Sequence, residues 1–172
     1  MVETGAFFVC EGVMQDILFK TEEFVFSYRI QGVLIRDGKA LLQRCGEDHA
    51  LIGGHVAAFE TTRETLVREF KEEIHADIAV DELIAVGEVF FPWGDKPCHQ
   101  IGLYYRARLL DESQIPLDGV FHGYDELGGE RIDLDFCWVP LEELEKIALY
   151  PPQIVPHILS GSNGVLHFIY KE

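Results

Sequence analysis

Polar and apolar residues alternate with a period of two over Tyr28–Gly32, within an otherwise apolar stretch from Phe24 to Arg36. This alternation is typical of a β-strand, because successive side chains point to opposite faces of a sheet. Asp37-Gly38 follows and is a strong signal for a two-residue hairpin, so we expect a partner strand at Lys39–Arg44. A shorter strand over Asp16–Lys20 is expected before this pair, separated from it by the polar turn 21–23.

The period changes to that of a helix after residue 60. Apolar residues now recur every three or four positions and fall on one arc, which predicts an amphipathic helix with one face toward a core. These residues are Leu66, Val67, Phe70 and Ile74. Thr61 and Thr62 are both suitable N-caps, and Thr61 has Glu64 three residues later, the pattern of a capping box. We expect the helix to extend from this cap to about His75.

The second half of the chain predicts further strands and two short helices. The expected strands are 77–80, 82–91, 100–109, 134–139 and 165–170. Pro140 suits the first turn of a helix, so we expect helices at Leu141–Leu149 and Gln153–Leu159. The expected loops are 46–50, the turn-rich 91–97 and the acidic, glycine-rich 111–133. This mixture of strands and helices predicts an α/β fold built as an α/β/α sandwich.

Composition narrows the class of protein. The chain has 172 residues, a length that suits one domain with a sizeable core, and a net charge of −16. So acidic a chain is a poor binder of nucleic acid polymers, which need basic patches. No apolar run approaches the length of a membrane span, and no signal peptide is evident.

The cysteines indicate the compartment. They are Cys10, Cys45, Cys98 and Cys137. Their wide spacing, with no CxxC pair, is typical of reduced thiols rather than of a zinc site or a disulfide framework. We therefore expect a cytoplasmic protein.

Three glutamates and one arginine are concentrated in the second half of the predicted helix. Glu69 and Glu73 are four positions apart and share a face, and Glu72 lies three positions from Glu69 on the same side. Like charges at this spacing repel one another, so the cluster suits a bound cation. Carboxylate oxygens are the ligands that Mg²⁺ and Mn²⁺ prefer. Arg68 can orient Glu72, four positions later. The alternative, from the clustering alone, is the solvated acidic face of a surface helix.

The spacing of these residues is that of a known motif, G-x5-E-x7-R-E-apolar-x-E-E. The matching positions are Gly54, Glu60, Arg68, Glu69, Phe70, Glu72 and Glu73. The flanking stretches VLIRDGKALLQR and FCWVPLEEL, the latter followed by LYPP, add to the match. On these residues the chain resembles the Nudix hydrolase family, from about Gln15 to Leu159.

The Nudix box spans Gly54 to Ala76 and departs from the family pattern at three positions. His75 and Phe59 stand where the family usually has glycine, and Ile52 stands where it often has proline. The position of His75 is a helix C-terminus that needs a left-handed residue, a conformation that histidine tolerates better than most residues do. None of these departures removes a carboxylate, so they affect the expected loop shape more than the chemistry.

The resemblance implies a Nudix-type pyrophosphohydrolase with an α/β/α sandwich and a mixed β-sheet. It implies hydrolysis of a diphosphate bond in a small-molecule nucleoside diphosphate derivative by water activated by Mg²⁺ or Mn²⁺. The metal ligands and catalytic carboxylates would be Glu69, Glu72 and Glu73, and the Gly53 carbonyl would be a further ligand. Glu60 would brace Arg68 or a metal-bound water.

Many Nudix enzymes draw a further acidic group from the region of the expected loop 111–133. The candidates in this chain are Asp125, Glu126, Glu130 and Asp133. We favour Glu126 and Glu130 as catalytic residues, because both are expected in the flexible middle with glycine nearby. The general base is thus either a box glutamate or a loop carboxylate, and for each residue of the loop a plain surface role is the alternative.

Four residues are candidates for substrate contacts. Arg29 and Arg44 are polar residues within otherwise apolar strands, where Nudix proteins often face their substrate, so they are candidate phosphate contacts; the alternative is a solvent-facing arginine. Phe91 and Trp93 could stack on a nucleobase, or they could simply pack against the core.

The resemblance leaves other functions open. Residues 1–13 are expected to be an extension, either an extra strand or disordered, ahead of a single Nudix domain at 14–172. The alternatives are a catalytically silent nucleotide-binding regulator and an interaction module, with a homodimer as one form of it. An isoprenoid diphosphate isomerase is disfavoured, because no clear pair of catalytic Cys and Glu residues is evident. The sequence does not separate ADP-ribose, nucleoside triphosphates, dinucleoside polyphosphates and sugar nucleotides.

Overall fold

The computed structural model of the protein describes residues 15–127 and 130–172, and side chains are described outside the segment 125–130. The expectation of an extra strand or a disordered extension at residues 1–13 lies outside the described residues. In the part of the chain that is described, no helix is both long enough and apolar enough to cross a membrane.

Most of the described chain is strand, with two α-helices and two 3₁₀ turns. The strands are β1 (Leu18–Lys20), β2 (Val25–Arg36), β3 (Lys39–Cys45), β4 (Asp48–Ala50), β5 (Ile78–Trp93), β6 (Lys96–Leu109), β7 (Val120–Leu127), β8 (Glu130–Pro140), β9 (Ala148–Tyr150) and β10 (Leu166–Lys171). The helices are α1 (Thr62–Ile74) and α2 (Ile154–Ser160), and the 3₁₀ turns are η1 (Glu112–Gln114) and η2 (Leu141–Glu143).

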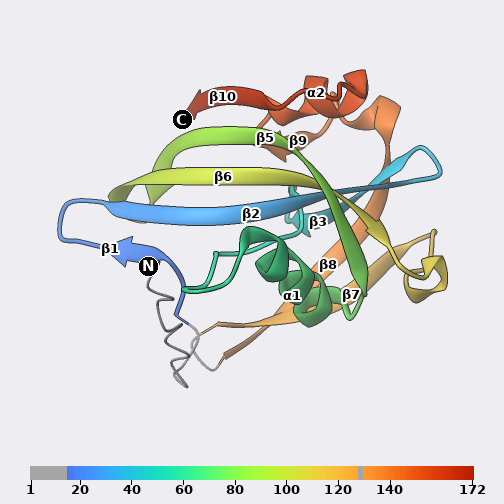
Figure 1. Ribbon diagram of the computed structural model, residues 1–172, viewed down its shortest axis with the longest axis horizontal. Coiled ribbons are helices and arrows are strands. Elements are labelled where there is room, and N and C mark those ends of the chain that lie inside the picture. The colour runs from blue at the N-terminus through green and yellow to red at the C-terminus, as the bar shows by residue number, and fades with distance from the viewer. Residues whose placement is uncertain (1–14, 128–129) are drawn as a thin grey trace, which may run out of the picture.

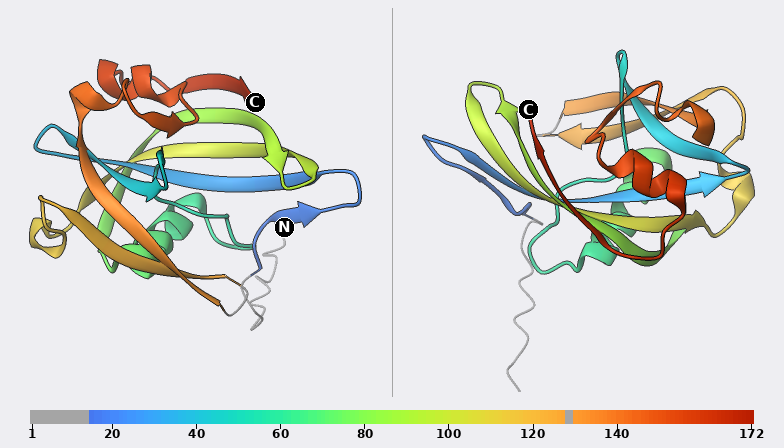
Figure 2. Two further views of the ribbon diagram at one scale, coloured as in Figure 1. Left: turned by 180° about the vertical axis from the view of Figure 1, so that it is seen from behind. Right: turned by 90° about the horizontal axis from the view of Figure 1, so that it is seen from above.

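The strands in the described ranges form one mixed sheet (Figure 1). Its main path runs β10-β5-β6-β2-β3-β4-β9, with β1 attached to β2, β8 to β3 and β7 to β8. The pairs β2–β6, β5–β10 and β4–β9 are parallel, and the others are antiparallel. In Figures 1 and 2 the two helices lie on opposite sides of strands β2, β6 and β5. The expected α/β architecture with a mixed sheet is therefore confirmed.

The alternation along β2 explains why the molecule has two hydrophobic clusters. Ile30 and Leu34 belong to the cluster that contains the apolar face of α1, whereas Val33 belongs to the cluster that contains the apolar face of α2. Gly32 allows α1 to approach closely, since a Cβ atom at this position would lie 2.7 Å from the Phe70 ring. The position of α1 on the sheet thus depends on a glycine in the strand beneath it.

Helix α1 begins and ends as its sequence predicts. Thr61 is the N-cap and forms a capping box with Glu64, and His75 is the C-cap. Leu66, Phe70 and Ile74 are buried, but Val67 is 42% exposed, so its expected place on the core face is wrong. Three polar residues of α1 are also buried, namely Thr65, Glu69 and Glu73.

Two expected loops are in fact hairpins. The segment 91–97 is the end of β5, a tight turn at Gly94 and the start of β6, with Trp93 paired to Lys96. The segment 111–133 contains η1 and then most of the β7–β8 hairpin, in which Leu127 pairs with Glu130. Strand pairing over many residues outweighs the low strand propensity of the glycine-rich and acidic sequence, because propensity is a weak local term.

Two shorter expectations are also wrong. Residues 141–149 do not form a helix, since only the 3₁₀ turn η2 follows Pro140 and the chain then enters β9. Residues 46–50 are not simply a loop, because β4 pairs with β3 on one side and with β9 on the other. The expected helix at Gln153–Leu159 is confirmed as α2, one residue later at each end.

Two positions that carry unusual residues adopt left-handed backbone conformations. Phe59 has φ of 71° and His75 has φ of 56°. The His75 ring packs against Tyr124 with ring centroids 5.4 Å apart, whereas Phe59 is 89% exposed. A left-handed conformation costs an L-residue about 1–2 kcal/mol, so Phe59 bears this cost with little packing in return.

Replacing Phe59 by glycine is expected to raise the free energy of unfolding by about 0.5–1 kcal/mol, because relief of backbone strain exceeds the added chain entropy. Urea unfolding measures this change. The matched control is His75→Gly, which has similar backbone geometry but loses the contact with Tyr124 and should gain less. A loss of stability in Phe59→Gly would show that the ring makes a contact that outweighs the strain.

Candidate active site

The double glycine of the box lies on a segment, residues 52–57, that runs alongside β2. The Ile30 N–H donates to the Gly54 carbonyl at 3.0 Å, and the Val56 N–H donates to the Tyr28 carbonyl at 2.9 Å. Gly53 has φ of 149°, and a Cβ atom there would lie 2.2 Å from the Ile30 carbonyl oxygen. Glycine is required at this position because the segment lies directly on the strand.

Gly54 makes room for the carboxylate of Glu69. A Cβ atom on Gly54 would lie 2.2 Å from the carboxyl carbon of Glu69 and 2.3 Å from each of its oxygens. The two residues come from the loop and from the middle of α1, and the fold brings them into contact. The first glycine of the box is therefore required for a steric reason, which the spacing of residues along the helix does not reveal.

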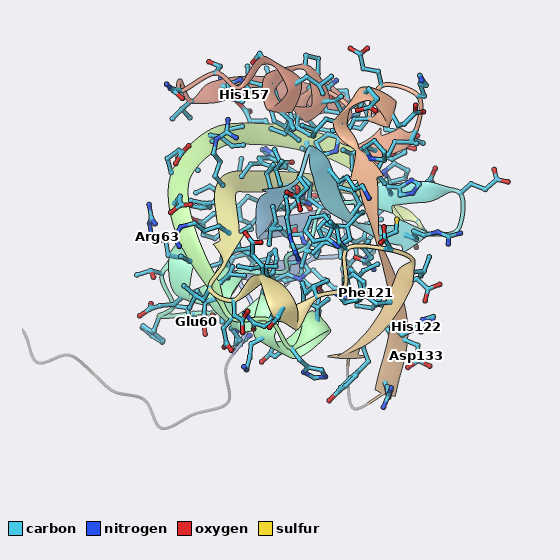
Figure 3. The ribbon with its side chains drawn as sticks, turned by 90° about the vertical axis from the view of Figure 1, so that its right-hand side faces the viewer. Glu60, Arg63, Phe121, His122, Asp133 and His157 are labelled. Atoms are coloured by element: carbon cyan, nitrogen blue, oxygen red, sulfur yellow. The ribbon has the colours of Figure 1, made fainter. Side chains whose placement is uncertain are left out.

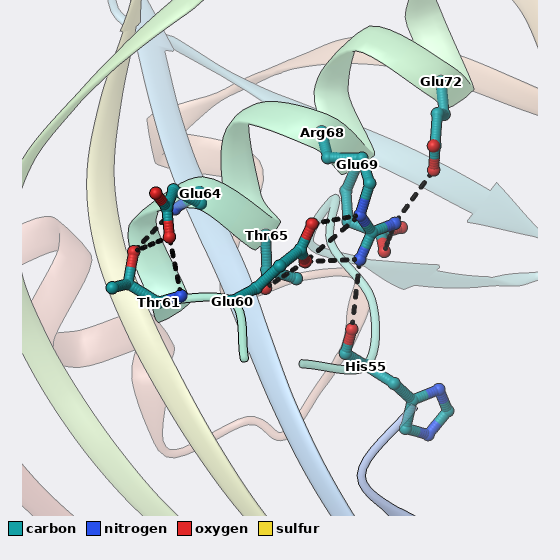
Figure 4. Close-up of polar contacts among 8 residues, drawn as sticks. All are labelled: His55, Glu60, Thr61, Glu64, Thr65, Arg68, Glu69 and Glu72. Carbon is teal, nitrogen blue, oxygen red and sulfur yellow. Dashed lines mark hydrogen bonds and ion pairs between the residues drawn. The ribbon is translucent and has the colours of Figure 1, made fainter. Parts of the chain in front are cut away.

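Arg68 connects four functional groups of the box (Figure 4). Its Nη1 donates to Glu69 Oε1 at 2.7 Å and to Glu72 Oε2 at 2.9 Å. Its Nε donates to both carboxylate oxygens of Glu60 at 3.2 Å, and its Nη2 donates to the His55 carbonyl at 3.4 Å. The contact with Glu72 is the one that the helix spacing predicts, while the contact with Glu69 adds to it.

Glu60 is held between Arg68 and the start of the helix. Its Oε2 accepts a hydrogen bond from the Thr65 hydroxyl at 2.8 Å, in addition to those from Arg68. This geometry agrees with a bracing role for Glu60, because its carboxylate fixes the guanidinium that in turn orients Glu69 and Glu72.

The carboxyl group of Glu69 is removed from water. Only 8% of the residue is exposed. Burial raises the pKa of Glu69 to about 7, although the positive charge of Arg68 acts in the opposite direction. A buried carboxylate of this kind is poorly compensated by the protein alone, so a further cation beside it would stabilise its charged form.

Glu73, one turn after Glu69, is also buried, at 5% exposure. Strand β7 packs directly against the helix here, because a Cβ atom on Gly123 would lie 1.9 Å from the Glu73 carbonyl oxygen. The negative charge of Glu73 reaches the neighbouring Cys45, whose pKa is raised by burial first and then by Asp48 and Glu73. The β7–β8 hairpin thus helps to position the last glutamate of the box.

The expected metal ligands have the right chemistry for a hard divalent ion. Glu69, Glu72 and Glu73 supply carboxylate oxygens from one helix, and Gly53 supplies a carbonyl oxygen beside it. Within the described ranges, no three His, Cys, Asp or Glu side chains are grouped as a metal-holding cluster as they stand. Glu69 Oε1 and Glu72 Oε2 already share the positive charge of Arg68, since both accept from its Nη1. The buried carboxylate of Glu69 suits the role of a metal ligand.

Arg29, a predicted substrate contact, lies beside the expected metal ligands. Its Nη2 donates to the Gly53 carbonyl at 2.9 Å. Its positive charge lowers the pKa of Glu69, an effect smaller than that of burial, which raises it. The structure therefore brings Arg29 to the double glycine and within electrostatic reach of Glu69 on α1.

Two side chains near this group were missed from the sequence. His55 follows the double glycine, and burial together with the charges of Arg29 and Lys20 lowers its pKa to about 4. Its ring lies 6.1 Å from that of Trp93, between centroids, and Lys20 Nζ lies 5.6 Å from the Trp93 centroid. A histidine directly after the glycines was a usable signal for His55, whereas no pattern pointed to Lys20.

The other two predicted substrate contacts lie in different surroundings. Phe91 packs against the hydrophobic cluster of α2, so part of its ring is committed to the core. Arg44 is exposed at the end of β3, opposite Asp135 of β8 and His49 of β4. Of the four candidates, Arg29 and Trp93 lie next to the double-glycine segment.

The acidic candidates of the former loop lie along the β7–β8 hairpin. Glu126 is the penultimate residue of β7 and Glu130 is the first residue of β8, both within the segment 125–130 whose side chains are not described. Asp133 is bound by Arg131 at 2.9 Å and is largely exposed. In Figure 3 the labelled His122 and Asp133 lie on the opposite side of the view from Glu60.

Several solved structures with a similar fold share low sequence identity with this chain. A NUDIX hydrolase from Nitrosomonas europaea has a TM-score of 0.58 at 20% identity, with 85% of this chain and 79% of that chain covered. A UDP-X diphosphatase has a TM-score of 0.54 at 17% identity, with 83% and 66% covered. An ADP-ribose pyrophosphatase from Streptococcus suis has a TM-score of 0.52 at 16% identity, with 83% and 98% covered. This likeness shows the fold.

A match to a protein-family model shows the family to which the chain belongs. The model of the NUDIX domain family matches residues 28–158, which include the double glycine, the whole of α1 and most of the sheet. This match covers well over half of the chain and includes the box residues Gly54, Glu60, Arg68, Glu69 and Glu72, which contact one another in the structure. The chain therefore belongs to the Nudix family.

Proposed function

We propose that the protein is a divalent-metal-dependent hydrolase that cleaves a diphosphate bond in a nucleoside diphosphate derivative. The observation that carries the proposal is the buried carboxylate of Glu69, seated on Gly54 and contacted by Arg68 at 2.7 Å. A charged group is expensive to bury unless it is paired or binds a metal. This arrangement supports a role for the Glu69 carboxylate as a ligand of a metal ion that also binds the phosphates of the substrate.

The residues of the chain would hold and orient the reacting groups. Glu69, Glu72 and Glu73 would bind Mg²⁺ or Mn²⁺, with the Gly53 carbonyl as a further ligand. When bound, such an ion offsets phosphate charge and lowers the pKa of water. Arg68, fixed by Glu60, would hold the carboxylates of Glu69 and Glu72 in fixed orientations.

The acceptor of the proton from the attacking water would be a carboxylate at this site. One candidate is a box glutamate whose charge is not fully committed to the metal. The other is an acid from the tip of the β7–β8 hairpin, Glu126 or Glu130, because β7 packs against α1 at Gly123. Loss of activity in Glu126→Gln or in Glu130→Gln would favour the hairpin.

The substrate would lie between the box and the β5–β6 hairpin. Arg29 would contact a phosphate, since it lies beside the Gly53 carbonyl and no ion pair joins it to a carboxylate among the described residues. The Trp93 ring would stack on the base. Arg44 and Phe91 remain candidates for the far end of the substrate. The names of two fold neighbours, a UDP-X diphosphatase and an ADP-ribose pyrophosphatase, favour a nucleoside diphosphate compound.

A phosphate-release panel tests the proposal. The substrates are ADP-ribose, a nucleoside triphosphate, a dinucleoside polyphosphate and a sugar nucleotide, each with Mg²⁺, with Mn²⁺ and with EDTA. We expect release from at least one class that stops with EDTA and is at least about 100-fold slower without added metal. Release that is unchanged by EDTA, or no release from any class, would contradict the proposal.

A catalytically silent nucleotide-binding regulator is the second candidate. One observation favours it: Arg68 already binds the carboxylates of Glu60, Glu69 and Glu72, so the protein itself supplies a cation at these groups. Nucleotide binding without turnover in the same panel would support the regulator.

A further inference from the structure

The Gly53 carbonyl is already bound by a cation. Arg29 Nη2 donates to this oxygen at 2.9 Å, and the Arg29 Nε is buried with no hydrogen-bond partner among the described residues. Under the proposed function, the same oxygen is a metal ligand. A guanidinium and a divalent ion repel each other strongly at the distance that one shared oxygen imposes, because the low-dielectric site screens them poorly.

The charge of Arg29 acts on neighbouring side chains as well as on the Gly53 carbonyl. Its charge acts on Glu69 and on the buried side chains of Cys98 and Tyr104, in each case lowering a pKa that burial raises. It also helps to lower the pKa of His55, after the larger effect of burial. The guanidinium therefore supplies positive charge beside the Gly53 carbonyl and within electrostatic reach of Glu69.

Arg68 and Arg29 differ in how firmly they are held. Arg68 is bound by Glu60, Glu69 and Glu72. In the described part of the chain, the hydrogen bond to the Gly53 carbonyl is the one polar contact of the Arg29 guanidinium, and no carboxylate forms an ion pair with it. Of the two arginines, Arg29 is thus the one that can leave its position at little cost, provided that another anion receives it.

We propose that Arg29 competes with the divalent ion for the Gly53 carbonyl and is drawn away from it by a substrate phosphate. This inference rests on the proposed function. Metal would bind weakly to the free protein, because Arg29 occupies one ligand and repels the ion. A diphosphate would accept the guanidinium and free the carbonyl, so metal and diphosphate bind with positive cooperativity, and by linkage each strengthens the other.

The experiment measures the Kd of Mn²⁺ from the EPR signal of the free ion, with Mn²⁺ alone and with methylenediphosphonate, a diphosphate that cannot be hydrolysed. A protein-free titration corrects for the complex of Mn²⁺ with the diphosphonate. We expect Arg29→Met to bind Mn²⁺ alone about tenfold more tightly than the wild type. Arg29→Lys keeps the charge and should bind Mn²⁺ as weakly as the wild type.

The diphosphonate should strengthen Mn²⁺ binding by about tenfold more in the wild type than in Arg29→Met, because the variant has no guanidinium to release. The matched control is Arg106→Met, which changes another half-buried sheet arginine, paired with Glu82 at 2.8 Å. It should leave the Kd of Mn²⁺ unchanged. Circular dichroism and a thermal melt of each variant verify folding.

The outcomes separate the inference from the proposed function. Equal Kd values for Mn²⁺ in the wild type and in folded Arg29→Met would overturn the competition and leave the metal site standing. Tighter binding in both Arg29→Met and Arg29→Lys would also overturn it, because side-chain shape and not charge would then be the cause. Absence of Mn²⁺ binding in all of these proteins would overturn the metal site and, with it, the competition.

Discussion

Replacing Glu69 by glutamine is expected to lower kcat by about 10³-fold or more while leaving the fold intact. The substitution keeps the shape of the side chain above Gly54 but removes the negative charge. Arg68 Nη1, 2.7 Å from the Glu69 carboxylate, can still donate to the amide oxygen. The loss therefore reports the missing charge rather than a cavity. Steady-state release of phosphate from the substrate found in the panel measures kcat.

The matched control for Glu69→Gln is Glu64→Gln on the same helix. Glu64 is exposed, and among the described residues its carboxylate bonds to Thr61 alone. Glutamine serves in a capping box as glutamate does. We expect near-normal kcat in this variant. If Glu69→Gln keeps more than about a tenth of the activity, the carboxylate is not a ligand of an essential metal.

Replacing Gly54 by alanine is expected to lower kcat by about 100-fold with little loss of stability. The new methyl group would lie 2.2 Å from the carboxyl carbon of Glu69, so the carboxylate must swing away. Because this group is the end of a flexible side chain, it can move without disturbing the backbone. The predicted damage is to the geometry of the site, and kinetics together with urea unfolding measure both effects.

Gly123→Ala is the informative comparison for Gly54→Ala. Its methyl group would lie 1.9 Å from the backbone carbonyl of Glu73, which cannot move without shifting α1 against β7. We expect a loss of about 2–3 kcal/mol of unfolding free energy from this overpacking. If Gly54→Ala instead loses stability and keeps its kcat, then the contact between Gly54 and Glu69 serves packing rather than catalysis.

Features that depend on near neighbours in the chain could be predicted from the sequence. The Thr61 cap, the end of α1 at His75 and the contact of Arg68 with Glu72 all join residues within one or two helical turns. The β2–β3 hairpin at Asp37-Gly38 is equally local. The chemistry of the carboxylates follows from the same short spacings, because helix geometry determines which side chains share a face.

Features that depend on distant pairing were predicted poorly. The β7–β8 hairpin has the composition of a loop, yet β8 pairs with β3 over six residues and Phe121 stacks on Phe136 at 5.5 Å between ring centroids. Residues 141–149 have a helical pattern, yet β9 pairs with β4. In each case a strand partner far away in the chain outweighs the local preference.

The features of the active site also differ in whether they depend on near neighbours in the chain or on distant residues. Periodicity and spacing were sufficient to place Glu69, Glu72 and Glu73 on one helix and to indicate an oxygen-ligand site. The fold alone seats Glu69 on Gly54 and places Arg29 at the Gly53 carbonyl. These contacts join a strand, a loop and a helix, so they exist only after the sheet has formed and α1 has packed on it through Gly32. A single sequence encodes such contacts through the summed packing of many residues, and no short pattern displays them.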